Sequence, residues 1–424
     1  MKIGLLGERL PHSFSPEIHR RLGYPGGGDY RLMEVSPEKL GEFFRLRDFD
    51  GINVTIPYKR AVIPYLADMS REARETGAVN TVVNRGGALY GHNTDLGGLM
   101  ALLRSIGAGD LTGKTVLIAG AGGTSLTARA AARRLGAERI FRLSRTPSGE
   151  GDVLGYGEAY ARYGGAQVLI NTTPAGMYPR VESCPVDLDR LPRLDTVADV
   201  IYNPVTTELV CQARERGIPH TGNGLGMLVC QAALAAAWFT GAPDSPPAWE
   251  PLRDALAFEK TNLVLAGMPG SGKSTLGRLL AKKLGRPFFD CDAEIVRSAG
   301  MPIPEIFSRY GETRFRDMET ETLARLCREP GQVIATGGGG ILRTENRRSI
   351  QRGGKLIFLD RPLSELLPTA DRPLSDDREK LEALYRTRYP VYLAAAEDWN
   401  GLRVPVAGTP EETANEIISM IENG

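Results

Sequence analysis

The stretch Gly267-Met268-Pro269-Gly270-Ser271-Gly272-Lys273-Ser274-Thr275 matches the pattern G-x-x-x-x-G-K-[ST] and begins well past the middle of the chain. It follows an apolar run at 262–266 and precedes a helix-like run at 276–284. In this context backbone N–H groups and a helix N-terminus together bind phosphates. Because such a loop normally follows the first strand of its own domain, we expect a nucleotide-binding domain to begin near Lys260 and a separate unit to precede it.

The composition is typical of a soluble protein with more than one domain. The chain has 424 residues, a formal net charge of +1 and 42% hydrophobic residues, which predicts no nucleic-acid partner and no anionic membrane partner. The first apolar run, 1–7, is too short for a signal peptide, and no stretch approaches a membrane span. The five cysteines are scattered and lack a C-x-x-C pair, so we expect no disulfide framework, no structural zinc and a cytoplasmic location.

The order of apolar runs predicts an α/β fold. A strand at 115–119, a glycine turn at 120–123, a helix at 126–135 and strands at 140–143, 168–170 and 196–201 form a βαβ series. Such a series is typical of a parallel, doubly wound sheet. An Ala-rich helix is expected at 227–239, and the proline-rich segment 241–249 is the best linker candidate.

The glycine turn of this series is by itself a weak dinucleotide signal. It supplies the first two glycines of G-x-G-x-x-G/A but has Ser125 at the third position. Its place between a strand and a helix suits a pyrophosphate at the helix N-terminus. The next strand ends in Ser144-Arg145-Thr146, where an NAD enzyme usually has an acid. An arginine there can pair with a 2′-phosphate, which favours NADP; the alternative is a solvated surface arginine.

Four polar segments precede this unit, at 11–19, 53–59, 77–81 and 91–95. Their hydroxyls, amides and one Lys/Asp pair suit a ligand with several hydroxyls and a carboxylate. Each segment alone also fits a turn, a loop cap or a surface charge. Their occurrence in order ahead of a Rossmann-like unit favours a binding site.

Together with 171–177, 199–204 and 224–231, these segments closely resemble shikimate dehydrogenase, from Gly4 to about Gly241. The resemblance implies a substrate-binding domain at 1–97, completed by a helix at 224–240, and a Rossmann-like NADP-binding domain at 98–223. It implies that Ser13 and Ser15 bind the substrate carboxylate and that Lys59 and Asp95 form the catalytic pair. The residues implied around the substrate ring and its hydroxyls are Thr55, Asn80, Asp95, Tyr202 and Gln231. Those implied for NADP are Gly120, Ala121, Gly122, Gly123, Ser144, Arg145, Thr146 and Gly224.

The sequence departs from that family at the adenosine end of the cofactor site. The family often has Asn-Arg-Thr followed by another basic residue, whereas here Ser144 replaces the Asn and Pro147-Ser148-Gly149 brings no second cation. A quinate/shikimate dehydrogenase that uses NAD, joined to a kinase for another small hydroxy acid, is an alternative, which the Ser144/Arg145 pair disfavours. A regulatory protein that senses the metabolite without turnover is a second alternative, disfavoured by the retained Lys59, Asp95, Lys273 and Asp292.

Several motifs follow the phosphate-binding loop in an order that points to the phosphate acceptor. A strand-like run ends in Asp290-Cys291-Asp292, Arg316 lies within 311–319, and an apolar run leads into the glycines 337–340. Such a glycine run lets the backbone approach a ligand closely. Arg316 has the alternative interpretation of an ion-pair partner for Glu319. For the later arginines, Arg372 and Arg388, the alternative interpretation is a solvated surface charge.

As a set these motifs resemble shikimate kinase over 261–422, in a P-loop domain at 260–424 that follows a linker at 241–259. The resemblance implies that Asp292 contacts the shikimate hydroxyls and accepts a proton, and that Asp290 and Ser274 hold Mg²⁺. The residues implied for ATP are Gly270, Ser271, Gly272, Lys273, Ser274, Thr275 and Arg372. Those implied for shikimate are Asp292, Arg316, Gly338, Gly339 and Arg388. The lid between Arg361 and Arg372 is shorter than usual and lacks an additional arginine.

The sequence thus predicts a bifunctional enzyme of aromatic amino-acid biosynthesis. The first part would reduce 3-dehydroshikimate to shikimate with NADPH, and the second would phosphorylate shikimate with MgATP. Both partners are small molecules, and the oligomeric state stays open.

Overall fold

The computed structural model describes residues 1–10, 13–24, 26–147, 151–366, 377–398 and 401–422. The chain divides into two compact units: a first unit, 1–203 with 207–255, and a second unit, 204–206 with 256–424. Three sheets, each covered by helices, confirm the predicted α/β class. No helix among the described residues is long and apolar enough to cross a membrane.

The first unit opens with a mixed sheet of order β2-β1-β3-β5-β6-β4. Its strands are β1 (Lys2–Gly7), β2 (Asp29–Glu34), β3 (Gly51–Val54), β4 (Asp68–Met69), β5 (Thr81–Arg85) and β6 (Ala88–His92). Strand β1 pairs in parallel with β2 and β3, while β5 runs antiparallel to β3 and β6. The helices are α1 (Ser15–Leu22), α2 (Leu40–Leu46) and α3 (Arg71–Thr76), with short 3₁₀ turns at Pro37–Lys39 and Ile63–Tyr65.

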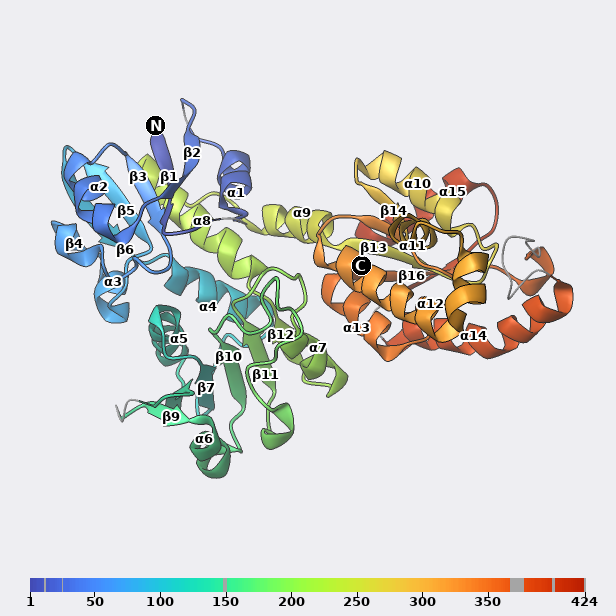
Figure 1. Cartoon of the computed structure of the whole chain (residues 1–424). Coiled ribbons are helices and arrows are strands. Elements are labelled where there is room, and N and C mark those ends of the chain that lie inside the picture. Colours follow the sequence, from blue (N-terminus) through green and yellow to red (C-terminus); the bar gives the residue numbers. More distant parts are fainter. Residues whose placement is uncertain (11–12, 25, 148–150, 367–376, 399–400, 423–424) are drawn as a thin grey trace. The chain divides into compact units, whose positions relative to one another are not determined.

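Helix α8 (Leu225–Thr240), which lies far along the chain, packs against this first sheet (Figure 1). Its residues Ala235 and Phe239 form a buried cluster with Ile3 and Val83 of the sheet. An added Cβ at Gly51 would lie 2.3 Å from the Phe239 ring, so glycine is what allows helix and strand to approach.

The second sheet is all parallel, in the order β12-β11-β10-β7-β8-β9. Its strands are β7 (Thr115–Ala119), β8 (Arg139–Ser144), β9 (Val153–Gly155), β10 (Val168–Asn171), β11 (Thr196–Asp199) and β12 (His220–Gly222). Helices α4 (Asp95–Ser105), α5 (Gly123–Arg134), α6 (Tyr156–Tyr163) and α7 (Glu208–Glu215) cover it, with a 3₁₀ turn at Leu188–Arg190.

Both faces of this sheet are buried, as the continuous apolar strands predict. In β7, Val116 and Ile118 join the core under α4 and α5, while Leu117 and Ala119 join the core on the other face. The chain passes from β7 to β8 on one side and later to β10 on the other. The carboxyl ends of β7 and β10 therefore flank the crevice where such folds bind ligands.

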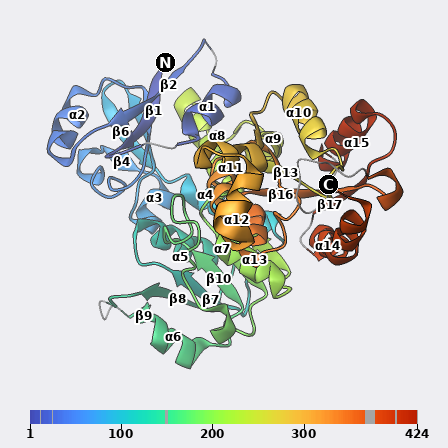
Figure 2. The same ribbon diagram turned by 45° about the vertical axis from the view of Figure 1, so that its right-hand side comes forward.

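The second unit has a parallel five-stranded sheet of order β14-β15-β13-β16-β17 (Figure 2). The strands are β13 (Asn262–Ala266), β14 (Phe288–Asp290), β15 (Val333–Ala335), β16 (Gly354–Asp360) and β17 (Leu402–Pro405). The helices are α10 (Lys273–Leu284), α11 (Cys291–Ala299), α12 (Ile303–Arg328), α13 (Thr344–Gly353), α14 (Arg378–Asp398) and α15 (Pro410–Glu422), with a 3₁₀ turn at Leu363–Glu365. Helix α12 has non-helical dihedrals at Gly311.

The predicted linker 241–259 is only partly irregular, because α9 (Glu250–Lys260) begins within it. Pro251 lies in the first turn of that helix, where a missing N–H costs no hydrogen bond. The five cysteines are free thiols in this structure.

Candidate functional sites

The Lys59 and Asp95 side chains meet in the first unit. Lys59 follows strand β3, and Asp95 is the first residue of α4. Lys59 Nζ lies 2.6 Å from Asp95 Oδ2, and the two side chains are 18% and 9% exposed. A carboxylate in the first turn of a helix is favoured by the helix dipole. The predicted catalytic pair is thus assembled in this structure.

A buried hydrogen-bond network continues from this pair. Asn80 Oδ1 accepts from the Thr94 N–H at 2.7 Å, and Asn80 Nδ2 donates to Thr94 Oγ1 at 2.9 Å. Asn80 Nδ2 also lies 3.4 Å from Gln231 Oε1 on α8. Asn80 and Gln231 are buried, so the helix that returns from position 225 supplies a side chain to the same cluster.

Ser13 and Ser15 lie in the first polar segment, just before and at the start of α1. The Ser15 N–H donates to Ser13 Oγ at 3.2 Å, and Ser15 is buried. Between them, the Phe14 ring lies 5.1 Å from the Tyr202 ring. The structure thus brings Tyr202 to the serine segment. Thr55 directly follows β3, and its N–H donates to Leu6 O of the neighbouring strand β1 at 2.9 Å.

Sequence reasoning did not single out the residues that join these segments. Tyr30 Oη donates to Asn53 Oδ1 at 2.8 Å, and Asn53 Nδ2 donates to Thr81 Oγ1 at 3.2 Å. Thr81 Oγ1 in turn bonds Asn80 Oδ1 at 3.1 Å. Asn53 and Thr81 lie inside the polar segments 53–59 and 77–81, so these segments could have indicated them. No sequence pattern indicated Tyr30.

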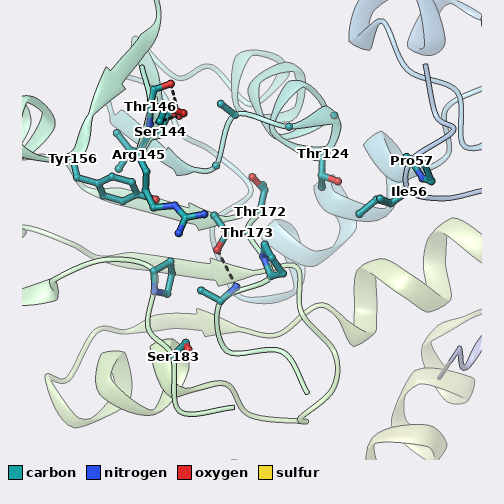
Figure 3. Close-up of a pocket in the computed structure, with 18 of the residues that line it drawn as sticks. Ile56, Pro57, Thr124, Ser144, Arg145, Thr146, Tyr156, Thr172, Thr173 and Ser183 are labelled. Carbon is teal, nitrogen blue, oxygen red and sulfur yellow. Dashed lines mark hydrogen bonds between the residues drawn. The ribbon is translucent and has the colours of Figure 1, made fainter. Parts of the chain in front are cut away.

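A pocket of about 880 Å³ opens beside Lys59 at the carboxyl ends of β7, β8 and β10 (Figure 3). Its lining includes all the residues predicted for NADP except Gly224. Gly120 has a φ of +108°, and an added Cβ would lie 2.7 Å from Thr172 Oγ1, whereas Gly122 and Gly123 face open space. The turn therefore leaves room above the N-terminus of α5, which fits a pyrophosphate.

The end of β8 forms the far part of this pocket. Ser144 Oγ accepts from the Thr146 N–H at 3.1 Å, and Arg145 extends from this turn toward Thr172 and Thr173 (Figure 3). Ile56 and Pro57 lie at the opposite end (Figure 3). Gly224 does not line this pocket, and an added Cβ there would lie 2.0 Å from Val200 O; its role in cofactor binding stays a prediction.

Asp199 supports the loop that carries Tyr202. Its carboxylate accepts from Asn171 Nδ2 at 2.9 Å, from the Ile201 N–H at 3.0 Å and from Thr207 Oγ1 at 2.7 Å. Burial raises the pKa of Asp199 to about 7, against the opposing effect of these hydrogen bonds. The group braces the ends of β10 and β11 and does not line the pocket.

In the second unit, the phosphate-binding loop wraps around Lys273. Lys273 Nζ donates to Gly267 O at 2.8 Å and to Met268 O at 2.9 Å, and the side chain is buried. An added Cβ at Gly267 would lie 2.8 Å from Leu359 O. Ser274 Oγ, one residue into α10, donates to Asp290 Oδ2 at 2.5 Å. The loop, the lysine and a hydroxyl–carboxylate pair are thus assembled.

Asp290 ends strand β14, and Asp292 lies in the first turn of α11 rather than in the strand-like run expected from sequence. The Asp290 Oδ1 caps that helix, accepting from the Asp292 N–H at 3.0 Å. The cap turns the Asp292 side chain toward the glycine run, where an added Cβ at Gly337 would lie 2.6 Å from Asp292 Oδ1.

Arg316 and Arg388, which are predicted to bind the phosphate acceptor, also contact the glycine run 337–340. Arg388 Nη1 donates to Gly338 O at 2.8 Å, beside a hydrogen bond from Tyr392 Oη to the same oxygen. An added Cβ at Gly339 would lie 2.1 Å from Arg316 Nη1. Helices α11, α12 and α14 therefore each bring one predicted side chain to one short loop.

Arg316 pairs with Glu319, as the alternative interpretation proposed, and with Glu312 at 3.0 Å. The ion pair is therefore present, and the role of Arg316 in substrate binding stays a prediction; the paired guanidinium also lies against Gly339. Glu319 is 3% exposed, and burial raises its pKa while Arg316 opposes the shift. Arg372 and the lid residues 367–371 lie outside the described residues.

Known proteins match both parts of the chain. The family model of the shikimate dehydrogenase substrate binding domain matches residues 5–82. The shikimate dehydrogenase (NADP(+)) of Geobacillus kaustophilus (strain HTA426) is 40% identical over 257 residues, which cover 56% of this chain and 92% of that protein. The chain belongs to the shikimate dehydrogenase family. A second family model, shikimate kinase, matches residues 269–422, so this family member also carries a shikimate kinase domain and is a bifunctional enzyme of the shikimate pathway.

Solved structures agree for the dehydrogenase part. Shikimate dehydrogenase 1 of Peptoclostridium difficile matches with a TM-score of 0.56 and 32% identity, over 61% of this chain and 98% of that one. Shikimate 5-dehydrogenase of Thermus thermophilus, in complex with NADP(H) and shikimate, matches with a TM-score of 0.53 and 30% identity, over 60% and 98%.

Proposed function

We propose that the first unit reduces 3-dehydroshikimate to shikimate with NADPH, reversibly, and that the second transfers phosphate from ATP to shikimate to give shikimate 3-phosphate. The observation that carries the first half is the Lys59–Asp95 pair at a pocket with a glycine turn and an arginine. We also propose the division into 1–97 with 224–240, 98–223 and 260–424.

In the dehydrogenase, NADPH supplies the hydride when bound. Reduction of a ring carbonyl leaves a developing alkoxide, and the Lys59 ammonium donates a proton to that oxygen. Asp95 holds the ammonium in place and accepts a hydrogen bond from a substrate hydroxyl. Ser13 and Ser15 bind the carboxylate, while Thr55, Asn80, Tyr202 and Gln231 surround the ring.

The buried network supports this assignment physically. Amides and hydroxyls that are held by one another in a low-dielectric interior lose little freedom when a ligand binds. Asn80 is held in this way by Thr94 and Thr81. A substrate hydroxyl that meets such a network finds donors and acceptors already oriented.

In the kinase, Lys273 and the N-terminus of α10 bind the phosphates of ATP, and Asp292 accepts the proton of the attacking hydroxyl. Arg316 and Arg388 bind the substrate carboxylate, for which planar guanidinium groups are well suited. The hydroxyl formed in the first reaction is the one phosphorylated in the second. We propose that Arg372 of the lid completes the ATP site.

Mg²⁺ fits the pair formed by Ser274 and Asp290. Among the described residues no group of three or more His, Cys, Asp or Glu could hold a metal. Mg²⁺ does not need one, because it is usually held by one or two carboxylates together with substrate phosphates and water. Ser274 would ligate the ion directly, and Asp290 through water.

Product analysis tests both halves together. The full chain is incubated with 3-dehydroshikimate, NADPH and MgATP, and the products are identified by mass spectrometry. Omission of ATP should leave shikimate, and omission of NADPH should leave 3-dehydroshikimate unchanged. Conversion of shikimate but not of 3-dehydroshikimate would refute the first half alone, and the reverse would refute the second. Replacing NADPH by NADH tests the alternative of an NAD-dependent enzyme.

A further inference from the structure

Cationic side chains line the cofactor pocket. Among the residues that the structure describes, Lys59, Arg60, Arg145 and Arg180 line it and no Asp or Glu does. Such a pocket favours an anionic ligand over its whole length. Arg180 is notable because it comes from the loop after β10, which no sequence signal connected with the cofactor.

Arg145 and Arg180 differ from the neighbouring arginine on the same sheet. Arg142 of β8 is buried and pairs with Asp152 at 2.7 Å, and Asp152 also pairs with Arg129. Within the described part of the chain, neither Arg145 nor Arg180 has an ion-pair partner. Their positive charge is therefore not neutralised by the protein.

The loop that carries Arg180 runs back toward the side of the sheet where Arg145 lies. The Ser183 N–H bonds Arg180 O at 3.4 Å, and the Asp187 N–H donates to Tyr160 Oη at 2.9 Å. Tyr160 belongs to α6, which directly follows β9, the strand paired with β8. Ser183 lies below the turn from which Arg145 extends, on the other side of the pocket (Figure 3).

The pyrophosphate and the 2′-phosphate of NADP(H) would bind in different parts of this pocket. The pyrophosphate has the glycine turn and the N-terminus of α5. The 2′-phosphate, placed at the end of the second strand of such folds, is a near-dianion that one arginine does not neutralise. Pro147 follows the turn, and no basic residue occurs before Gly151.

We propose that Arg180 supplies the second cation for the 2′-phosphate of NADP(H), opposite Arg145, and so helps to set the preference for NADP(H) over NAD(H). This inference rests on the proposed NADPH-dependent reduction. It explains how a chain without a second basic residue after Arg145 still presents two guanidinium groups to the same pocket.

The test compares two nucleotides that differ only in the 2′-phosphate. Binding of 2′,5′-ADP and of 5′-AMP to the full chain is measured by calorimetry for the unchanged protein and for Arg180→Gln. Because charge-assisted hydrogen bonds to phosphate are strong, we expect affinity for 2′,5′-ADP to fall on the order of 10-fold and affinity for 5′-AMP to stay the same. The KM for NADPH should rise, with the KM for NADH unchanged. Arg180→Lys should retain most of the selectivity.

A matched control is Arg193→Gln, an exposed arginine farther along the same connection that does not line the pocket; it should change neither affinity. Equal losses for both nucleotides in Arg180→Gln, or no loss for either, would overturn the proposal. Urea unfolding of the same variant reports whether its first unit is folded. Nucleotide binding can be measured without turnover, so the two proposals can fail separately. If the unchanged protein does not reduce 3-dehydroshikimate but Arg180→Gln selectively loses 2′,5′-ADP binding, the proposed reaction is refuted and the 2′-phosphate site stands.

Discussion

Lys59 Nζ and Asp95 Oδ2 lie 2.6 Å apart although 36 residues separate them in the sequence. Both side chains are largely buried, at 18% and 9% exposure. The contact joins the segment after β3 to the first turn of α4. Lys59 also lines the pocket proposed for the cofactor, which agrees with the proposed role of Lys59 as proton donor.

Lys59→Ala should lower NADPH-dependent reduction by about 10²- to 10⁴-fold, the usual contribution of a positioned general acid, and leave phosphorylation of shikimate unchanged. Steady-state rates of both reactions on one preparation measure this. The control is Lys114→Ala, which removes another lysine paired with an aspartate, Asp195, in the same unit. Intact reduction in Lys59→Ala would show that another group donates the proton.

Lys273→Ala should have the opposite effect, abolishing ATP-dependent phosphorylation while reduction continues. The substitution removes the charge that reaches the phosphates and the hydrogen bonds to Gly267 O and Met268 O. Lys283→Ala, an exposed lysine in the last turn of the same helix, serves as the control. ATP binding by calorimetry should fail in the first variant and persist in the second.

Gly339→Ala should lower kcat/KM for shikimate by about 10- to 100-fold, since a displaced arginine loses charged hydrogen bonds to the substrate. The added Cβ would lie 2.1 Å from Arg316 Nη1, and Glu319 and Glu312 hold that guanidinium in place. Reduction of 3-dehydroshikimate by the same variant is the control and should be unchanged. A kcat/KM for shikimate equal to that of the unchanged protein would contradict the assignment of Arg316.

The stability of the first unit should fall as the pH drops from about 6.5 to 4, in part through His92. Burial lowers the pKa of His92 from 6.5 to about 4, with Arg85 acting in the same direction and Glu72 against it. The unfolded chain therefore binds a proton in this window that the folded chain does not, and the free energy of unfolding decreases.

His92→Phe should make this decrease smaller. Neither ring nitrogen of His92 has a hydrogen-bond partner among the described residues, and the ring stacks on Trp238 at 3.6 Å. Phenylalanine keeps the stack and cannot titrate. Urea unfolding of both proteins at pH 6.5 and 4.5 gives the difference; an identical loss in the two would exclude His92. A residual decrease is expected from His19, whose pKa burial lowers to about 3.

Local pattern predicted the α/β class, the parallel series of strands and the positions of both nucleotide loops. The phosphate-binding loop at 267–275 and the turn at 120–123 are short-range features, since each needs glycines at fixed places between a strand and a helix. The sequence did not predict α9, which begins at Glu250 within the segment proposed as a linker. Nor did it predict the close approach of Gly224 to Val200 O.

The sequence by itself therefore determined which residue types stand at which strand ends, because a motif is a local property of the chain. Only the tertiary structure decided which of them meet. Gln231 reaches Asn80 because α8 folds back across the first sheet, and Arg388 of α14 reaches Gly338 O across 50 residues of sequence. Arg180 joins the cofactor pocket because its loop returns toward α6. Such contacts depend on how layers pack over long sequence separations, and no spacing in the chain encodes them.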